Sequence, residues 1–228
     1  MDSFSPHVEI LPPPQRQLWL ELAELPAEFV LYVGTALALH LGHRQSVDFD
    51  FFALCDLDLD RIAADIPFLA DASITQRERN TLSVIVNREG PVKVSFFGVP
   101  RLRQLAPPLV VETNGLKVAS LLDLAGTKAS VVQVRAEAKD YVDIDALLQD
   151  GRIHLPLALS AAQAIYGKSF NPQITLKALS YFGEGDLHRL PDQMKNRLAA
   201  AAQMVDLDQL PDLQHLSPSG GQHPSVDK

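Results

Sequence analysis

Short apolar runs with period-two alternation dominate the first half of the chain. They are rich in Val, Ile, Leu and Phe and are bounded by Gly, Pro, Asn or charged residues, a pattern that predicts β-strands. The predicted strands cover residues 29–33, 47–52, 73–79, 82–87 and 92–98. Residues 88–91 read as the turn that joins the last two.

Helices are predicted between these strands and ahead of them. The prolines Pro12 to Pro14 mark an N-terminal arm, and an amphipathic helix with Trp19, Leu22 and Leu25 on one side follows at once. Two further helices are predicted at 57–69 and at 35–42, where Thr35 is the expected N-cap and Gly42 the expected end. The first half is therefore a mixed α/β region.

From residue 119 onward the apolar positions repeat with helical spacing. The predicted helices cover residues 119–133, 136–148, 157–167, 173–182 and 192–207. Residues 211–228 are poor in apolar side chains and predict a flexible tail. We therefore expect an α/β domain with its arm over 1–118, a helical region over 119–210 that completes the active site, and the tail.

Composition places the chain among ordinary folded proteins. Its 228 residues are 46% hydrophobic and 21% charged, with one cysteine and a formal net charge of −8. One cysteine leaves no intrachain disulfide partner, and no apolar run is long enough to predict a membrane span, so we expect a cytoplasmic protein. The stretch 71–139 is locally basic, which suits a nucleoside triphosphate or RNA, or equally a solvated sheet face.

The strand at 47–52 carries the most informative polar residues. Side chains alternate along a strand, so Val47, Phe49 and Phe51 are expected to face the core while Asp48 and Asp50 share the other face, with Cα atoms about 6.5 Å apart. Two such carboxylates repel each other unless a cation compensates, and Mg²⁺ or Mn²⁺ is the natural choice. The alternative is that both simply face solvent on an exposed sheet.

Residues just before this strand are suited to phosphate. Gly34 allows a backbone to approach a ligand, and Thr35 opens a helix whose free N–H groups attract anions. Arg44 and Ser46 add a guanidinium and a hydroxyl. Each has an ordinary explanation as a turn, a surface residue or a strand start, but together with the acidic pair they favour phosphoryl chemistry.

The motifs resemble those of the AbiEii/AbiGii-type nucleotidyltransferases, which include the toxins of abortive-infection toxin–antitoxin systems. The resemblance covers about residues 27–150 and rests on 32–37 (YVGTAL), 44–52 (RQSVDFDFF), 121–128, Arg135 and 139–143 (KDYVD). It implies a nucleotidyltransferase-like mixed sheet with flanking helices. It also implies that Gly34, Thr35 and Ser46 hold a triphosphate, that Asp48 and Asp50 bind the metal, and that a downstream lysine and aspartate complete the site.

Lys128 is the matching lysine. If 128–148 formed one helix, Lys128, Arg135, Lys139 and Asp143 would lie within an arc of roughly 80°, whereas Asp140 would lie about 120° from Lys128. This favours Asp143 as the inward acid that orients Lys128 or the acceptor. Arg135 is a further expected nucleotide contact. Asp140 and Lys139 are second choices, because a break near 135–137 would invalidate the calculation, and the segment also fits a helix with solvated charges.

Several positions depart from the pattern or stand outside it. Val33 stands where many such sites have a glycine, and Ser95 aligns with the third carboxylate that many nucleotidyltransferases place on a later strand. His43 lies beside Arg44, where contact with phosphate is possible. Cys55 is expected to be a buried small side chain rather than a nucleophile.

The leading interpretation is a metal-dependent nucleotidyltransferase that moves NMP from an NTP to an RNA end, such as that of a tRNA, or to another acceptor hydroxyl. As the toxin of a toxin–antitoxin pair it would have an antitoxin partner and no membrane partner. The alternatives are a catalytically weakened nucleotide-binding module, a stand-alone enzyme acting on a sugar or antibiotic, and a phosphatase with an Asp-x-Asp nucleophile.

Overall fold

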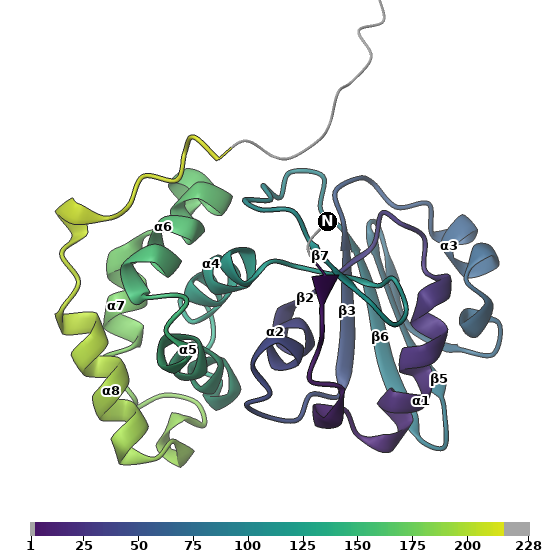
Figure 1. The fold of residues 1–228 in the computed structure, drawn as a ribbon, viewed down its shortest axis with the longest axis horizontal. Helices are drawn as coiled ribbons and strands as arrows, with labels where there is room; N and C mark the ends of the chain where they lie inside the picture. Colours follow the sequence, from purple (N-terminus) through teal and green to yellow (C-terminus); the bar gives the residue numbers. More distant parts are fainter. Residues whose placement is uncertain (1–2, 217–228) are drawn as a thin grey trace, which may run out of the picture.

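A mixed β-sheet lies beside a group of helices in the computed structural model, which describes residues 3–216 (Figure 1). The strands are β1 (Ser3–Phe4), β2 (Val30–Tyr32), β3 (Asp48–Ala53), β4 (Ser73–Glu78), β5 (Thr81–Asn87), β6 (Pro91–Gly98), β7 (Leu109–Val111) and β8 (Lys117–Val118). The helices are α1 (Pro13–Glu21), α2 (Val33–Leu41), α3 (Leu59–Asp65), α4 (Leu121–Val131), α5 (Ala138–Asp150), α6 (Leu155–Tyr166), α7 (Pro172–Ala178) and α8 (Asp192–Gln203). The predicted α/β class, with a helical second half, is confirmed.

The eight strands form one sheet in the order β1-β7-β8-β2-β3-β6-β5-β4. The β3/β6, β2/β8 and β1/β7 pairs are parallel and the others antiparallel. Strands β1, β7 and β8 are absent from the sequence-based prediction, because strands of two or three residues are too short to show alternation. They extend the sheet beyond β2 and leave β3 in its interior.

The core packs mainly against one face of β3. Phe49 and Phe51 are fully buried, with the Phe49 ring 6.4 Å from Trp19 of α1 and the Phe51 ring 5.6 Å from Phe96. This outcome confirms the predicted alternation along the strand. Val47 departs from it: it precedes β3, is 52% exposed, and its expected place in the core is wrong.

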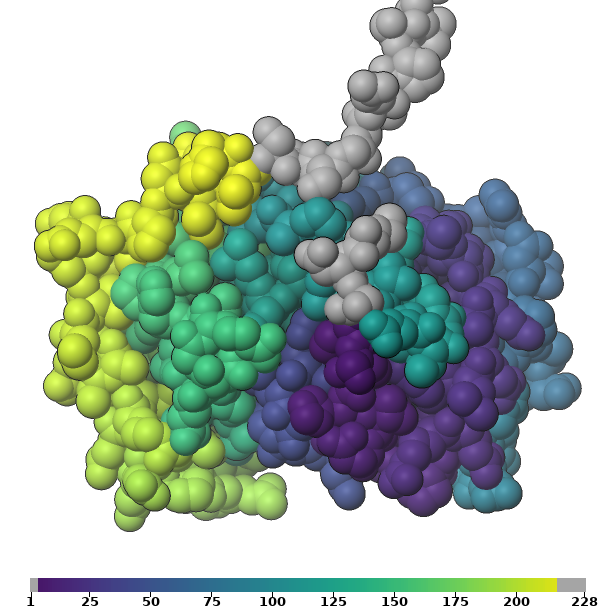
Figure 2. All heavy atoms as spheres, viewed as in Figure 1, coloured from purple at the N-terminus to yellow at the C-terminus, as the bar shows by residue number. Residues whose placement is uncertain are grey.

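Helix α2 lies on the opposite face of the sheet from α1 and α3, between the strands and helices α4 and α5 (Figure 1). Helices α4 and α6 approach closely at Gly126, where an added Cβ would lie 2.9 Å from the Ala161 carbonyl carbon. Figure 2 shows the sheet half and the helical half in contact along a continuous boundary. No helix within residues 3–216 is both long and apolar enough to span a membrane.

Several predicted boundaries need correction. The helix expected at 57–69 ends at Asp65 and is followed by a 3₁₀ turn at Pro67–Leu69, since a residue before proline is driven to an extended conformation. Cys55 is exposed, so its predicted burial is wrong. Within the predicted tail, Arg103 donates to the carbonyls of Gln214 and Leu216, so residues 211–216 are held against the protein, whereas 217–228 lie outside the described residues.

Candidate active site

Asp48 and Asp50 project from β3 on the face opposite the aromatic core, as the alternation predicts. In the β3/β6 pairing, Asp48 lies opposite Lys93 and Asp50 opposite Ser95, so the position aligned with a third carboxylate is next to the acidic pair. Burial and the Asp48 charge raise the pKa of Asp50, while Lys93 and a hydrogen bond from Ser95 act in the other direction. The pair therefore carries the expected like-charge repulsion.

A cavity of about 300 Å³ opens over this pair. Its walls come from the start of α2, the loop before β3, strands β3 and β6, helix α4, and the segment from Arg135 to α5. The predicted site residues that line it are Gly34, Thr35, Arg44, Ser46, Asp48, Asp50, Lys128, Arg135 and Lys139. The fold thus brings predicted site residues from positions 34 to 139 together around one cavity.

The N-terminus of α2 faces the cavity, but it begins two residues earlier than predicted. The N-cap is Tyr32, with no side-chain capping bond, and Val33 and Gly34 form the first turn. Thr35 is therefore not the cap. Its buried hydroxyl lies 2.7 Å from the Ser46 hydroxyl and donates to the Asp48 carbonyl, which ties α2 to the loop before β3. The uncapped N–H groups of this turn are suited to an anion.

Gly34 lies directly beneath the guanidinium of Arg44. An added Cβ at this position would be 2.7 Å from Arg44 Nη2 and 3.9 Å from Ser46 Oγ. Val33 just before it has a φ of 62°, a left-handed conformation that is costly for a β-branched residue. A glycine, the residue that the family resemblance implies at this position, would adopt that conformation without the same cost. Gly34 thus permits the close approach of Arg44, whereas Val33 departs from its favoured backbone conformation.

Asp143 lies behind the cavity and holds two of its cations. Its fully buried carboxylate accepts from Arg44 Nε at 2.7 Å and Nη2 at 2.9 Å, and lies 2.6 Å from Lys128 Nζ. His43 Nε2, 2.7 Å away, also donates to it, so His43 contacts an acid rather than a phosphate position. Burial raises the pKa of Asp143, but hydrogen bonds from His43 and Arg44 and the Lys128 charge outweigh it, and the pKa lies well below its usual range.

Asp140 forms the second half of the same buried network. It accepts from Lys128 Nζ at 2.7 Å and from Arg135 Nε at 2.7 Å. Burial raises its pKa, but Arg135 and Lys128 bring the pKa below its ordinary value. The single helix assumed over 128–148 is wrong, because α4 ends at Val131 and α5 begins at Ala138. Both acids consequently point inward, and Asp140 is as buried as Asp143.

The two carboxylates on the cavity wall, Asp48 and Asp50, could bind a cation that takes its other ligands from substrate and water. Among residues 3–216 no three His, Cys, Asp or Glu side chains converge on one point, which leaves the two acids of β3. Mg²⁺ and Mn²⁺ prefer oxygen ligands, and Mg²⁺ is commonly held by one or two carboxylates with substrate phosphates and water completing its shell. Burial and the Asp48 charge both disfavour the ionised form of Asp50, and a cation between the two carboxylates would offset both effects, so the residues fit such an ion.

The sequence as a whole matches a known family. A family model described as nucleotidyl transferase AbiEii toxin, type IV TA system, matches residues 17–219. The chain belongs to the AbiEii nucleotidyltransferase toxin family. The predicted family resemblance is thereby confirmed, and it extends beyond the 27–150 on which the motifs lay, through the helical half.

One sequence relative and two solved structures are similar to the chain, and the structures show its fold. The AbiEii chain is 29% identical over 157 residues to an uncharacterised Aquifex aeolicus (strain VF5) protein, aq_aa25, covering 68% of this chain and 74% of the relative. Two solved structures share its fold: an H. pylori protein described as a nucleotidyltransferase, and MenT4, a nucleotidyltransferase toxin of Mycobacterium tuberculosis H37Rv. The first has a TM-score of 0.52 at 19% identity, covering 83% of this chain and 90% of that one. The second has a TM-score of 0.58 at 15% identity, covering 84% of each.

The AbiEii protein is thus a nucleotidyltransferase, and the roles of its individual residues stay predictions. Two contributors were missed from sequence. His43 was considered only for phosphate, and its contact with Asp143, 100 positions away, has no local signal. Lys93 lines the cavity opposite Asp48. Its position two residues before Ser95 in the predicted strand could have placed it on the same face as Ser95.

Proposed function

We propose that this protein transfers NMP from an NTP to an acceptor hydroxyl, with Mg²⁺ or Mn²⁺ held by Asp48 and Asp50. In this reaction the acceptor oxygen forms a bond to the α-phosphorus, the bond from that phosphorus to the β-phosphate oxygen breaks, and pyrophosphate leaves. The acceptor hydroxyl loses its proton to water. When bound, the metal supplies charge neutralisation at the phosphates and orients them.

The observation that carries the proposal is one cavity lined by the two β3 carboxylates, an uncapped helix start and several cations. Asp48 and Asp50 supply the negative wall that a divalent ion needs. The first turn of α2 and Arg44 supply donors for the phosphate oxygens that such an ion would share. An acidic pair beside phosphate donors is the arrangement that metal-dependent phosphoryl transfer requires.

The cations of the cavity divide into held and free groups. Lys128, Arg44 and Arg135 are fixed by Asp143 and Asp140, so they present positive charge at defined positions with little entropy left to lose. Lys139 is half exposed, and its one ion pair within residues 3–216 is with the half-buried Glu137, which leaves its ammonium free to follow a phosphate. We assign Lys128 and Arg135 to triphosphate neutralisation and Asp143 to positioning Lys128 and Arg44.

The acceptor in this proposal is an RNA end, and the setting is a toxin–antitoxin pair. The family description supports the second point, and the locally basic cavity of an otherwise acidic chain supports the first. The expected partners are an NTP, an RNA and a cognate antitoxin, in the cytoplasm. The alternative is a sugar or antibiotic acceptor, which pyrophosphate release in the absence of RNA would favour.

Pyrophosphate release tests the proposal. Purified protein is incubated with each of the four NTPs, Mg²⁺ or Mn²⁺, and a total RNA pool, with EDTA and RNA-free reactions as controls. We expect metal-dependent pyrophosphate release together with label from one α-³²P-NTP appearing in RNA. Label transfer that persists in EDTA, or inorganic phosphate released in place of pyrophosphate, contradicts the proposal and favours phosphatase chemistry.

One observation favours the binding-module alternative. Ser95 lies opposite Asp50, where a third carboxylate would complete a metal site, and its hydroxyl receives a hydrogen bond from Ser83 at 3.2 Å. A pure binder would be protected from heat by NTP with Mg²⁺ and release no pyrophosphate. Thermal shift and pyrophosphate release measured on the same preparation therefore separate the two functions.

A further inference from the structure

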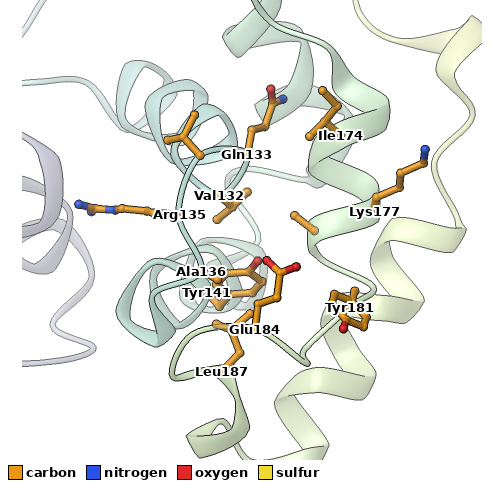
Figure 3. Close-up of a pocket in the computed structure, with 12 residues that line it drawn as sticks. Val132, Gln133, Arg135, Ala136, Tyr141, Ile174, Lys177, Tyr181, Glu184 and Leu187 are labelled. Carbon is orange, nitrogen blue, oxygen red and sulfur yellow. The ribbon is translucent and has the colours of Figure 1, made fainter.

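A second cavity, of about 460 Å³, lies in the helical half of the molecule (Figure 3). One wall is the link between α4 and α5, residues 132–136, and the other is formed by α7 and the segment that follows it to Leu187. This acceptor groove, as we name it, is larger than the cavity over the acidic pair. None of the functions described so far uses it.

Arg135 lines both the acceptor groove and the cavity of the candidate active site, so the two cavities adjoin at this residue. In Figure 3 its side chain extends away from the groove, and its guanidinium binds Asp140 at the active site. Gly34, Arg44 and Ser46, the proposed triphosphate residues, line only the active-site cavity. A ligand that passes Arg135 into the groove therefore leaves the triphosphate end of the site.

The walls of the groove combine polar side chains with exposed apolar ones, and the groove is open to solvent. Val134 is 83% exposed, Ile174 44% and Tyr181 60%, three of the few large hydrophobic side chains left exposed within residues 3–216. Exposed apolar side chains gathered around one hollow mark a binding surface. The active-site cavity has no aromatic side chain among its lining residues, so the groove is the nearby place where a base can stack.

Charges along the groove indicate which part of a ligand lies where. Lys177 is exposed at the outer rim, where a phosphate is favoured, whereas the guanidinium of Arg135 is turned out of the groove toward Asp140. Glu184 faces the interior in Figure 3, where a carboxylate repels phosphate but accepts from the amino group of a base. An aromatic and aliphatic surface with a carboxylate inside and a cation at the outer rim fits a nucleoside whose phosphate lies on the outer side.

We propose that the acceptor groove binds a single-stranded segment of the RNA acceptor, with a base against Tyr181 and Ile174 and the following phosphate near Lys177. The inference rests on the proposed function for its chemistry. An acceptor is favoured over the NTP base because the groove is open and Lys177 lies at its outer rim, which allows a chain to continue past the bound nucleoside. Stacking on aromatic side chains is the usual basis of single-strand binding.

Fluorescence anisotropy with a fluorescein-labelled, mixed-sequence 12-nucleotide RNA tests the proposal without turnover. Because stacking of a base is worth about 1–3 kcal/mol, Tyr181→Ala is expected to raise the RNA Kd about fivefold or more. Lys177→Glu is expected to raise it as well, more at low salt than at high salt. Lys168→Glu is the matched control, since it makes the same charge change at an exposed position outside the groove and should have little effect.

Two further measurements keep the outcomes separate. RNA containing 4-thiouridine is expected to crosslink to residues 132–136 or 174–187, whereas 4-thio-UTP is expected to crosslink elsewhere. Crosslinking of 4-thio-UTP in the groove, or equal loss of RNA binding in the Lys168→Glu control, overturns the inference. The rise in Tm that NTP produces in wild type and in both groove variants reports on the proposed function alone. If NTP raises the Tm normally but neither substitution weakens RNA binding, only the groove proposal is refuted.

Discussion

Arg44 and Asp143, 99 positions apart, form a two-pronged ion pair, with Nε and Nη2 at 2.7 and 2.9 Å from the two carboxylate oxygens. Arg44 comes from the loop before β3 and Asp143 from α5, so the pair joins the sheet to the helical half at the candidate active site. Its position indicates that the helical half is part of the site. Removal of either partner should affect stability and nucleotide binding together.

Asp143→Asn should lower stability at pH 7 by about 3–5 kcal/mol, because it leaves the half-buried Arg44 without its carboxylate and the buried Lys128 with Asp140 alone. Asp150→Asn is the matched control: its partner Arg152 is largely exposed, and we expect a loss of about 1 kcal/mol or less. Chemical denaturation at pH 7 measures both losses. Equal effects of the two substitutions would contradict the assigned role of the buried network.

The same network predicts how stability depends on pH. The pKa values of Asp143 and Asp140 are lowered in the folded protein, so their contribution is present above the unfolded carboxyl pKa of about 4 and is lost as pH falls through the folded values. We expect the free energy of unfolding to fall steadily below about pH 5. The fall should be shallower in Asp143→Asn, and curves of equal slope would show that Asp143 is not the group being protonated.

Val33→Gly should stabilise the protein. Val33 has a φ of 62°, and left-handed backbone costs a non-glycine residue about 1–2 kcal/mol, more than the entropy that glycine loses on folding. Val134→Gly is the control, because that exposed valine has no positive φ and its replacement should not stabilise. A rise in Tm for the first variant only is expected, and a fall for Val33→Gly would mean that the valine side chain contributes more than its backbone costs.

Lys128 and Lys139 line the same cavity but should respond differently to substitution. Lys128→Met leaves two buried acids short of a partner and should cost several kcal/mol of stability, whereas Lys139→Ala breaks only an exposed pair with Glu137. Lys139→Ala should therefore keep its Tm and weaken NTP more than NMP, since a point cation acts most strongly on concentrated phosphate charge. Equal weakening of NTP and NMP would place Lys139 outside the phosphate site.

Local patterns in the sequence were enough to locate the acidic face of β3, the helical second half and the cavity residues near Gly34. They were insufficient for β7 and β8, which are too short for alternation, and for the helix start at Val33, which depends on a strained backbone. The break between α4 and α5 turned Asp140 inward, against a calculation based on one straight helix. The His43–Asp143 contact depends wholly on how two distant elements pack, and no pattern in either segment indicates it.

The central claim is that Asp48 and Asp50 hold the catalytic metal, and Asp50→Asn tests it most directly. Pyrophosphate release from NTP at saturating Mg²⁺ is compared among wild type, Asp50→Asn and the exposed control Asp71→Asn, with Tm measured in EDTA and in Mg²⁺. Burial and Asp48 raise the pKa of Asp50, so its ionisation costs folded-state stability without a metal, and the variant should match or exceed the wild-type Tm in EDTA. We predict a loss of at least about tenfold in rate, equivalent to about 1.4 kcal/mol, and no stabilisation by Mg²⁺. A variant that keeps more than a tenth of the wild-type rate and still gains stability from Mg²⁺ would contradict the account.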